Sequence, residues 1–338
     1  MKGTIMFKKA LSVAAIAAAI CMPGIVFAQT APAPDKPADA KPEEPKPSYT
    51  LTGNFGVFSQ YIFRGLTQTD RKPAAQGGFD WAHESGFYLG TWLSNICWPK
   101  ENASVNGGGV IPNLITGTYE SGGSLEWDFY GGYKWSLPKD FVIDFGTLYY
   151  YYPGNTSNFY NLVTSAAMAP VPFQGAPKLD TWEVYIAPSW KWFTVKYSYS
   201  VLDHTFGTLN SKGTGYLDVS ANVPLGDYMK DLNGLTLNLH WGWQKYKGTD
   251  PRNVLFRGAY GGAVPDNDTI LTYKDAKVGL TYALPKDFSI GAYWSKGFSY
   301  NKLGYGGVGD PAGPPGFFGP YPRDIASSTG TVFIQKTF

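Results

Sequence analysis

The segment 125–136 reads Leu-Glu-Trp-Asp-Phe-Tyr-Gly-Gly-Tyr-Lys-Trp-Ser and alternates between apolar and polar side chains. Because successive side chains of a β-strand point to opposite faces, the segment is predicted to be a strand with one apolar face and one polar face. The apolar set is Leu125, Trp127, Phe129, Tyr133 and Trp135. Aromatic residues near the ends of such a face are typical of strands that cross a membrane, where they lie at the lipid boundaries.

The same alternation recurs along the chain between clusters of Gly, Pro, Asn and Asp. Twelve strands are expected, near residues 50–64, 75–84, 86–96, 124–136, 140–152, 181–190, 192–201, 214–224, 234–247, 274–283, 287–297 and 328–338. An even number of strands is what bacterial single-chain membrane barrels require.

The connections between these strands alternate in length. Short turns are expected near residues 85, 138, 191 and 285, with a longer one at 226–233. The long connections are 66–74, 97–123, 153–180, 202–213, 248–273 and 298–327. The pattern predicts an all-β fold, a transmembrane antiparallel up-and-down β-barrel of about 12 strands (10 to 14), with long extracellular loops and short periplasmic turns.

The region before the first strand divides into two parts. Three lysines precede an apolar run over residues 10–20, and small residues precede a cleavage site after Ala28, so residues 1–28 are predicted to be a cleaved signal peptide. Residues 29–48 lack large apolar side chains and are expected to be a flexible periplasmic leader. The barrel then covers residues 49–338. Beyond the signal no apolar stretch is long enough for a membrane helix.

Composition excludes other classes of protein. The chain has 28 Lys and Arg against 26 Asp and Glu, and removal of the three lysines of the signal changes the net charge from +2 to 25 − 26 = −1. A nucleic-acid partner is therefore not expected. Aromatic residues reach 17% and charged residues only 16%, which is unusual for a soluble enzyme. Cys97 is the one cysteine after the signal, so no internal disulfide can form.

Two blocks of sequence carry a family resemblance. Residues 60–70 read Gln-Tyr-Ile-Phe-Arg-Gly-Leu-Thr-Gln-Thr-Asp, and residues 75–92 begin Ala-Gln-Gly-Gly-Phe-Asp-Trp-Ala. A later block, 217–227, ends Asn-Val-Pro-Leu-Gly-Asp. These blocks resemble the TorF-type porin family, also described as the Gcw_chp group of conserved hypothetical outer-membrane proteins. Gln60 departs from the usual Asp and Thr67 from the usual Ser. The resemblance implies an outer-membrane barrel and no established substrate, cofactor or catalytic residue.

The last strand ends on an aromatic residue. Val332, Ile334 and Phe338 alternate along it, which resembles the signal that the barrel-assembly machinery reads in outer-membrane barrels; Lys336 departs from the usual apolar residue. This resemblance implies the assembly machinery as a partner and the bacterial outer membrane as the location.

The alternation also assigns side chains to the two faces of the wall. The pore-lining candidates are Arg64, Asp80, Glu126, Asp128, Lys134, Asp144, Glu183, Lys196, Asp218, His240 and Lys277. The lipid-facing aromatic candidates are Trp127, Trp135, Trp182, Trp190, Tyr197, Tyr199, Trp241, Trp243 and Phe338. Arg64 is expected to line the pore or to form a salt bridge with Asp80 on the next strand.

The sequence favours a porin-like channel for passive diffusion of ions or small polar solutes through a narrow polar lumen. The alternatives are a barrel that its own paired charges plug, and a closed barrel with a surface-binding or structural role through its long loops. An enzyme is not expected, because His83, His204 and His240 each lack a neighbouring Ser or carboxylate constellation. No metal or cofactor motif is present. Membrane lipid and lipopolysaccharide are expected partners, and a homo-oligomer is possible.

Overall fold

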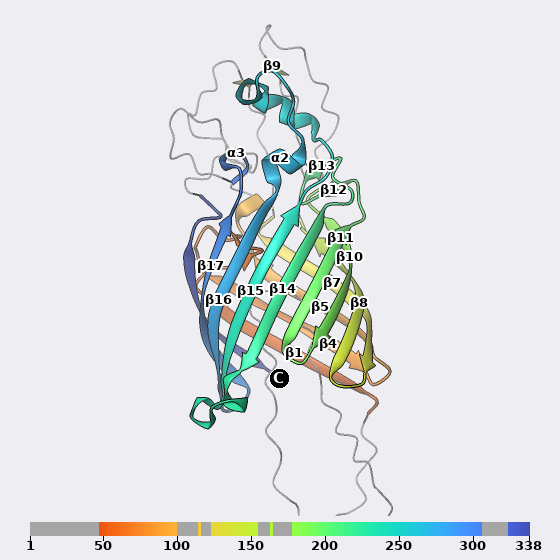
Figure 1. Ribbon diagram of the computed structural model, residues 1–338, viewed down its shortest axis with the longest axis vertical. Coiled ribbons are helices and arrows are strands. Elements are labelled where there is room, and N and C mark those ends of the chain that lie inside the picture. The colour runs from red at the N-terminus through yellow and green to blue at the C-terminus, as the bar shows by residue number, and fades with distance from the viewer. Residues whose placement is uncertain (1–46, 100–113, 116–122, 155–162, 165–177, 306–323) are drawn as a thin grey trace, which may run out of the picture.

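The computed structural model describes residues 47–99, 114–115, 123–154, 163–164, 178–305 and 324–338, and within them twelve strands close into one antiparallel barrel (Figure 1). The strands, in their order around the wall, are β1 (Tyr49–Phe58), β4 (Ala74–His83), β5 (Phe87–Asn95), β7 (Leu125–Leu137), β8 (Phe141–Tyr151), β10 (Thr181–Trp190), β11 (Phe193–Ser200), β14 (Gly215–Pro224), β15 (Leu235–Lys245), β16 (Tyr273–Leu284), β17 (Phe288–Phe298) and β18 (Thr329–Thr337). The prediction of a twelve-stranded antiparallel barrel is confirmed.

The predicted strand boundaries agree with the structure to within two residues, with one exception. The first strand was expected to continue to Arg64, and that prediction is wrong because β1 ends at Phe58. At that point β1 pairs with both of its neighbours, opposite Ala74 of β4 and Phe333 of β18. The chain then leaves the wall, and residues 59–73 form a loop that returns at β4.

The outer face of the barrel is apolar and exposed. Leu89 is 61% exposed, Val332 is 60% exposed and Phe79 is 58% exposed, all at alternate positions of their strands. The inner positions of the same strands are buried, as the repeated buried and exposed alternation of β10 shows. Period-two patterning has therefore placed the apolar side chains outward and the polar ones inward, the reverse of a soluble sheet sandwich.

The two ends of the barrel differ. At one end, tight turns connect the strands, and Figure 1 shows the C-terminus there. The repeated sequence Leu-Pro-Lys-Asp-Phe forms two of these turns, with positive φ at Lys139 and Asp140 and again at Lys286 and Asp287. Residues 225–234 form the longest of these connections, with short 3-10 helices η1 (Leu225–Asp227) and η2 (Lys230–Leu232).

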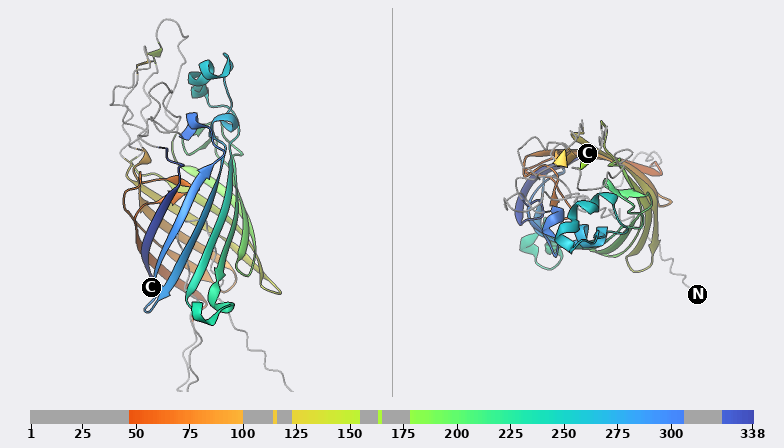
Figure 2. Two further views of the ribbon diagram at one scale, coloured as in Figure 1. Left: turned by 60° about the vertical axis from the view of Figure 1, so that its left-hand side comes forward. Right: turned by 90° about the horizontal axis from the view of Figure 1, so that it is seen from above.

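The described parts of the long connections belong to the opposite end of the barrel. Their described elements are β2 (Ile62–Phe63), β3 (Leu66–Thr67), β6 (Leu114–Ile115), β9 (Val163–Thr164), β12 (His204–Thr205), β13 (Thr208–Leu209), η3 (Pro251–Tyr260), α2 (Asn267–Leu271) and α3 (Lys302–Tyr305). Figure 2 shows η3 and α2 above the wall there. No helix in the described ranges is long and apolar enough to cross a membrane. The predicted signal peptide and nearly all of the predicted leader lie outside the described residues.

Candidate functional site in the barrel lumen

The loop after β1 folds into the barrel as a small hairpin. β2 and β3 pair through Ile62 with Thr67 and Phe63 with Leu66, and Arg64 and Gly65 form the turn. Both turn residues have positive φ, 46° and 78°. A Cβ on Gly65 would lie 2.4 Å from the Cβ of Asp275 on β16, so the tip packs closely against β16 and only glycine fits there. We call residues 59–73 the lumen hairpin.

Arg64 holds the tip of the lumen hairpin across the lumen. Its guanidinium donates to the carboxylate of Glu183 on β10 through Nη2 at 2.7 Å and Nη1 at 3.0 Å, and to Gln244 Oε1 on β15 at 2.8 Å. The ring of Tyr216 on β14 lies 4.1 Å from the guanidinium carbon. Both charged side chains of the pair are almost fully buried. A bidentate Arg–carboxylate pair of this kind restricts the orientation of both side chains and also adds binding energy.

The base of the lumen hairpin is fixed on the other side of the barrel. Tyr61 donates to Glu126 Oε1 on β7 at 2.6 Å and packs edge-on against Trp92 of β5, with ring centroids 5.4 Å apart. Gln60 donates to Thr329 Oγ1 of β18 at 2.7 Å. The lumen hairpin is therefore held from both halves of the wall.

These contacts correct the expected pairing of Arg64. A salt bridge to Asp80 was one of two expectations, and it is wrong: Asp80 instead accepts a hydrogen bond from Tyr130 at 2.6 Å. The physical reason is that Arg64 lies at a hairpin tip rather than on the first strand, so it reaches across the lumen to Glu183 instead of sideways to the next strand.

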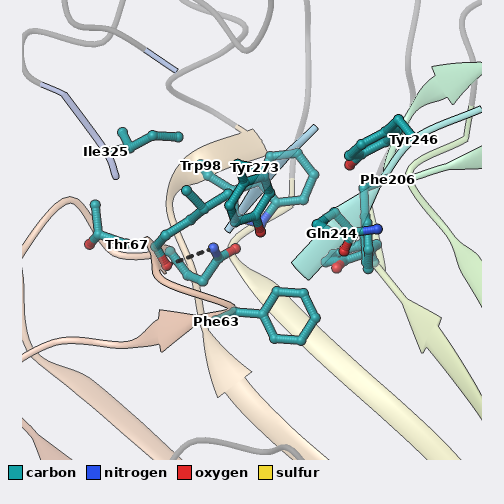
Figure 3. Close-up of a pocket in the computed structure, with 11 residues that line it drawn as sticks. Phe63, Thr67, Trp98, Phe206, Gln244, Tyr246, Tyr273 and Ile325 are labelled. Atoms are coloured by element: carbon teal, nitrogen blue, oxygen red, sulfur yellow. Dashed lines mark hydrogen bonds between the residues drawn. The ribbon is translucent and has the colours of Figure 1, made fainter. Parts of the chain in front are cut away.

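A small cavity remains on the long-loop side of the lumen hairpin. Figure 3 shows Phe63, Phe206, Gln244 and Tyr273 around it, contributed by the hairpin and by three other parts of the chain. Its volume is about 50 Å³. Water molecules therefore fit in this space beside the lumen hairpin.

The structure places ten of the eleven pore-lining candidates on the inner side of the wall and Arg64 at the tip of the lumen hairpin, in two environments. Arg64, Glu126, Asp128, Asp144, Glu183, Lys196 and Asp218 are buried. Asp80, Lys134, His240 and Lys277 are partly exposed. Whether solute passes these side chains stays a prediction. The nine aromatic candidates lie on the outer face, and their contact with lipid is likewise a prediction.

A second network joins three consecutive strands of the inner wall at His240 of β15. Its Nδ1 lies 2.9 Å from Asp218 Oδ2 on β14, and its Nε2 lies 2.8 Å from Asp275 Oδ1 on β16. Ser220 Oγ is 3.1 Å from Nδ1. The sequence offered no local Ser or carboxylate constellation for His240, but three strands bring two carboxylates and a serine to it in the fold. Both ring nitrogens face carboxylates, so the histidine ties the wall together rather than serving as a free base.

A third network lies nearer the short-turn end. Tyr88 of β5 donates to Asp144 Oδ1 on β8 at 2.7 Å, and its hydroxyl is 2.5 Å from that of Tyr185 on β10. The amine of Lys196 on β11 lies 3.8 Å from the centre of the Tyr185 ring. The lumen-facing tyrosines thus act mainly as spacers that connect charges from neighbouring strands.

Acidic groups outnumber basic ones along this lumen. The inner positions of the twelve described strands and the hairpin tip carry seven acidic residues, Asp80, Glu126, Asp128, Asp144, Glu183, Asp218 and Asp275. The basic residues there are Arg64, Lys134, Lys196 and Lys277, with His240 between two carboxylates. Asp275 is the one acidic member that the sequence reasoning missed. No group of His, Cys, Asp or Glu within the described ranges is arranged to hold a metal ion.

An apolar outer wall, a charged inner wall and complete closure define a β-barrel of the type that spans membranes. The chain belongs to the Gcw_chp family, described as a bacterial protein of unknown function, whose sequence profile matches residues 42–303. The resemblance to this group is thereby confirmed.

Solved barrels show distant likeness. A KdgM porin shares 8% identity over 85% of this chain and 99% of its own, with a TM-score of 0.42. A NanC porin shares 9% identity over 85% and 98%, with a TM-score of 0.40. Pseudomonas aeruginosa OprD shares 12% identity over 85% and 66%, with a TM-score of 0.33. Likeness at this level says nothing about solute or mechanism. No curated protein matches the chain.

Proposed function

We propose that the protein is an outer-membrane channel of the TorF-type porin kind, in which ions or small polar solutes diffuse passively through a narrow lumen that the lumen hairpin constricts. The observation that carries the proposal is the closed twelve-stranded barrel itself, whose outer face is apolar and whose inner face carries charged side chains of both signs. The long loops then face the cell exterior and the short turns face the periplasm.

The outer face supports membrane insertion. Large apolar side chains are exposed over the whole height of the wall, and Leu51 at 66% would be costly to leave in water. Trp135, Trp190 and Phe338 are exposed near the short-turn end, whereas Trp182 and Trp294 are exposed near the long-loop end. Two aromatic bands separated by aliphatic residues fit the two boundaries of a bilayer.

The inner face supports a preference for cations. Its acidic residues exceed its basic ones, and a narrow, low-dielectric passage with an excess of one sign attracts the opposite ion. Asp80, Lys134 and Lys277 are partly exposed charges of both signs. They are therefore the side chains that a passing ion meets without any rearrangement of the buried pairs.

A closed barrel with a surface-binding role is the second candidate, and one observation favours it. The Arg64–Glu183 pair and the His240 network connect opposing or neighbouring strands through buried hydrogen bonds, as a permanent plug would. In that case the long loops carry the function and the lumen conducts nothing.

Reversal potentials of the refolded protein in planar bilayers with a tenfold KCl gradient test the proposal. We expect stepwise currents with a cation preference, because acidic groups predominate. Asp80→Asn should shift the reversal potential toward anions, and Lys277→Gln should shift it in the opposite direction. Folded barrels that carry no current under any applied voltage would contradict the channel and favour the closed barrel.

A further inference from the structure

The outer face of the wall carries charge at very few positions. Along the twelve described strands, the outward-facing side chains include no Asp or Glu, and the Lys residues among them are Lys245, Lys274, Lys296 and Lys336. Lys336 lies on β18 at the short-turn end. The other three lie on β15, β16 and β17, which are consecutive strands, and all three are at the long-loop end.

The strand register places these three lysines close together. Trp243 is opposite Lys274, so Lys245 lies one diagonal step from Lys274 on the same face. Lys274 is also opposite Phe298, so Lys296 lies one diagonal step away on the other side. Diagonal neighbours on one face are about 7–8 Å apart, and flexible lysine side chains close that gap easily. We call Lys245, Lys274 and Lys296 the lysine triad.

One carboxylate is near the lysine triad. Asp268 of α2 accepts from Lys245 Nζ at 3.2 Å, and Lys245 also lies over Trp243, 5.5 Å from the ring centre. Within the described residues, neither Lys274 nor Lys296 forms an ion pair with a carboxylate. With Asp268 included, the lysine triad therefore has a net charge of about +2.

The surroundings of the lysine triad are those of a lipid boundary. Trp243 and Trp294 lie on the same outer face, each two residues before its lysine and so nearer to the middle of the strand. Below them the face is apolar, with Val278 48% exposed and Leu280 45% exposed. Figure 1 shows the ends of β15, β16 and β17 side by side beneath α2 and α3. Amines at this height reach the head-group layer while their stems stay against the wall.

We propose that the lysine triad is a binding site for the phosphate groups of lipopolysaccharide in the outer leaflet. Three amines within one lipid head group's width match the charge of a phosphorylated sugar, and the apolar wall below them accommodates the attached acyl chains. The site faces the outer leaflet because it lies at the long-loop end. The inference rests on the proposed outer-membrane placement, but not on whether the lumen conducts.

The test compares lipid binding by the intact barrel and by two triple variants in nanodiscs, with native mass spectrometry to count bound lipid. The K245Q/K274Q/K296Q variant removes the lysine triad. The K191Q/K230Q/K336Q variant removes three lysines at the short-turn end and serves as a control of equal charge change. The probes are bisphosphorylated lipid A, dephosphorylated lipid A and phosphatidylglycerol.

Each lysine near an anionic surface contributes a factor of about five in affinity, so loss of two unpaired lysines should weaken binding of bisphosphorylated lipid A roughly 25-fold. The control variant should bind as the wild type does, and dephosphorylated lipid A should show no dependence on the triad. Equal binding of lipid A by the triad variant would overturn the site. Phosphatidylglycerol bound as tightly as lipid A would overturn its assignment to lipopolysaccharide. Conductance recorded on the same samples reports separately on the channel.

Discussion

Replacement of Arg64 by alanine should open the lumen. Arg64 makes two hydrogen bonds to Glu183 and one to Gln244, and all of them link the lumen hairpin to the opposite wall. In the Arg64→Ala variant, Glu183 is left buried without its charged partner while the hairpin stays inside, and its carboxylate keeps only the long hydrogen bond of 3.4 Å from Tyr150 among the described residues. Its carboxylate regains water when the hairpin moves out, so the substitution destabilises the inward position specifically.

The size of the effect follows from the burial of the pair, whose two side chains are 4% and 3% exposed. Removal of one partner from a buried ion pair costs about 3–5 kcal/mol. Even the lower value corresponds to a factor of more than 100 in a two-state equilibrium, since 1.4 kcal/mol is about tenfold. The fraction of time that the hairpin spends out of the lumen should therefore rise by about two orders of magnitude.

Single-channel recording in planar bilayers measures this directly. Arg64→Ala should give larger or longer openings than the wild type. Arg71→Ala is the matched control, because Arg71 lies in the same loop but is exposed and contacts Ser327. The reasoning is refuted if Arg64→Ala and the wild type show the same step size and the same open fraction while both are folded.

Three further predictions concern the hairpin tip, the outer face and the loop around His204. Gly65→Ala should loosen the hairpin tip and raise conductance, because its Cβ would collide with Asp275. Gly258→Ala is the control, because that glycine has open space around it, and its conductance should equal that of the wild type. Equal conductance for the two variants would contradict the close fit at the tip. Leu280→Arg places a charge on the outer face, so it should lower the free energy of unfolding of the barrel in liposomes by about 2–4 kcal/mol, as denaturant titration measures it. Leu280→Val should lower it far less. An equal loss for both variants would argue against contact of Leu280 with lipid. Burial lowers the pKa of His204 below its usual 6.5, so its neutral form is favoured in the fold and its contribution to stability is lost as the pH falls through and below 6.5. After correction for the intrinsic slowing of amide exchange at low pH, the protection of residues 203–210 against hydrogen exchange should fall between pH 7.5 and pH 5, and His204→Gln should abolish that fall.

The wall of the barrel could be predicted from the sequence because its determinants are local. Alternation within a segment such as 125–136 assigns each side chain to a face, and the turn residues of Leu137–Phe141 mark where a strand reverses. Closure and strand order follow from the alternation of short and long connections. These features need no knowledge of contacts between distant residues.

The lumen hairpin could not be predicted in this way. Tyr61 and Phe63 continue the alternation of β1, so the segment reads as more strand, and only Gly65 marks the turn. The contacts that turn it inward join residues far apart in the chain, as in Arg64 and Glu183, which are separated by 119 positions. Hydrogen bonds of that range leave no periodic pattern in the sequence.

The positions of the charged lumen residues could be predicted from the sequence, but their contacts could not. Asp275 is two residues from Lys277 and so shares its inner face, which the predicted strand 274–283 already implied. Its partner His240 could be assigned to the inner face but not to a network, because the register between β15 and β16 decides which side chains meet.

In the proposed channel, a conducting barrel is constricted by its own first loop. Deletion of residues 60–71, with Ser59 and Lys72 joined by a short glycine linker, removes the hairpin and leaves all twelve strands in place. Single-channel conductance of this variant should be severalfold higher than that of the wild type at the same salt concentration. A deleted barrel that is folded and conducts no more than the wild type would contradict the account.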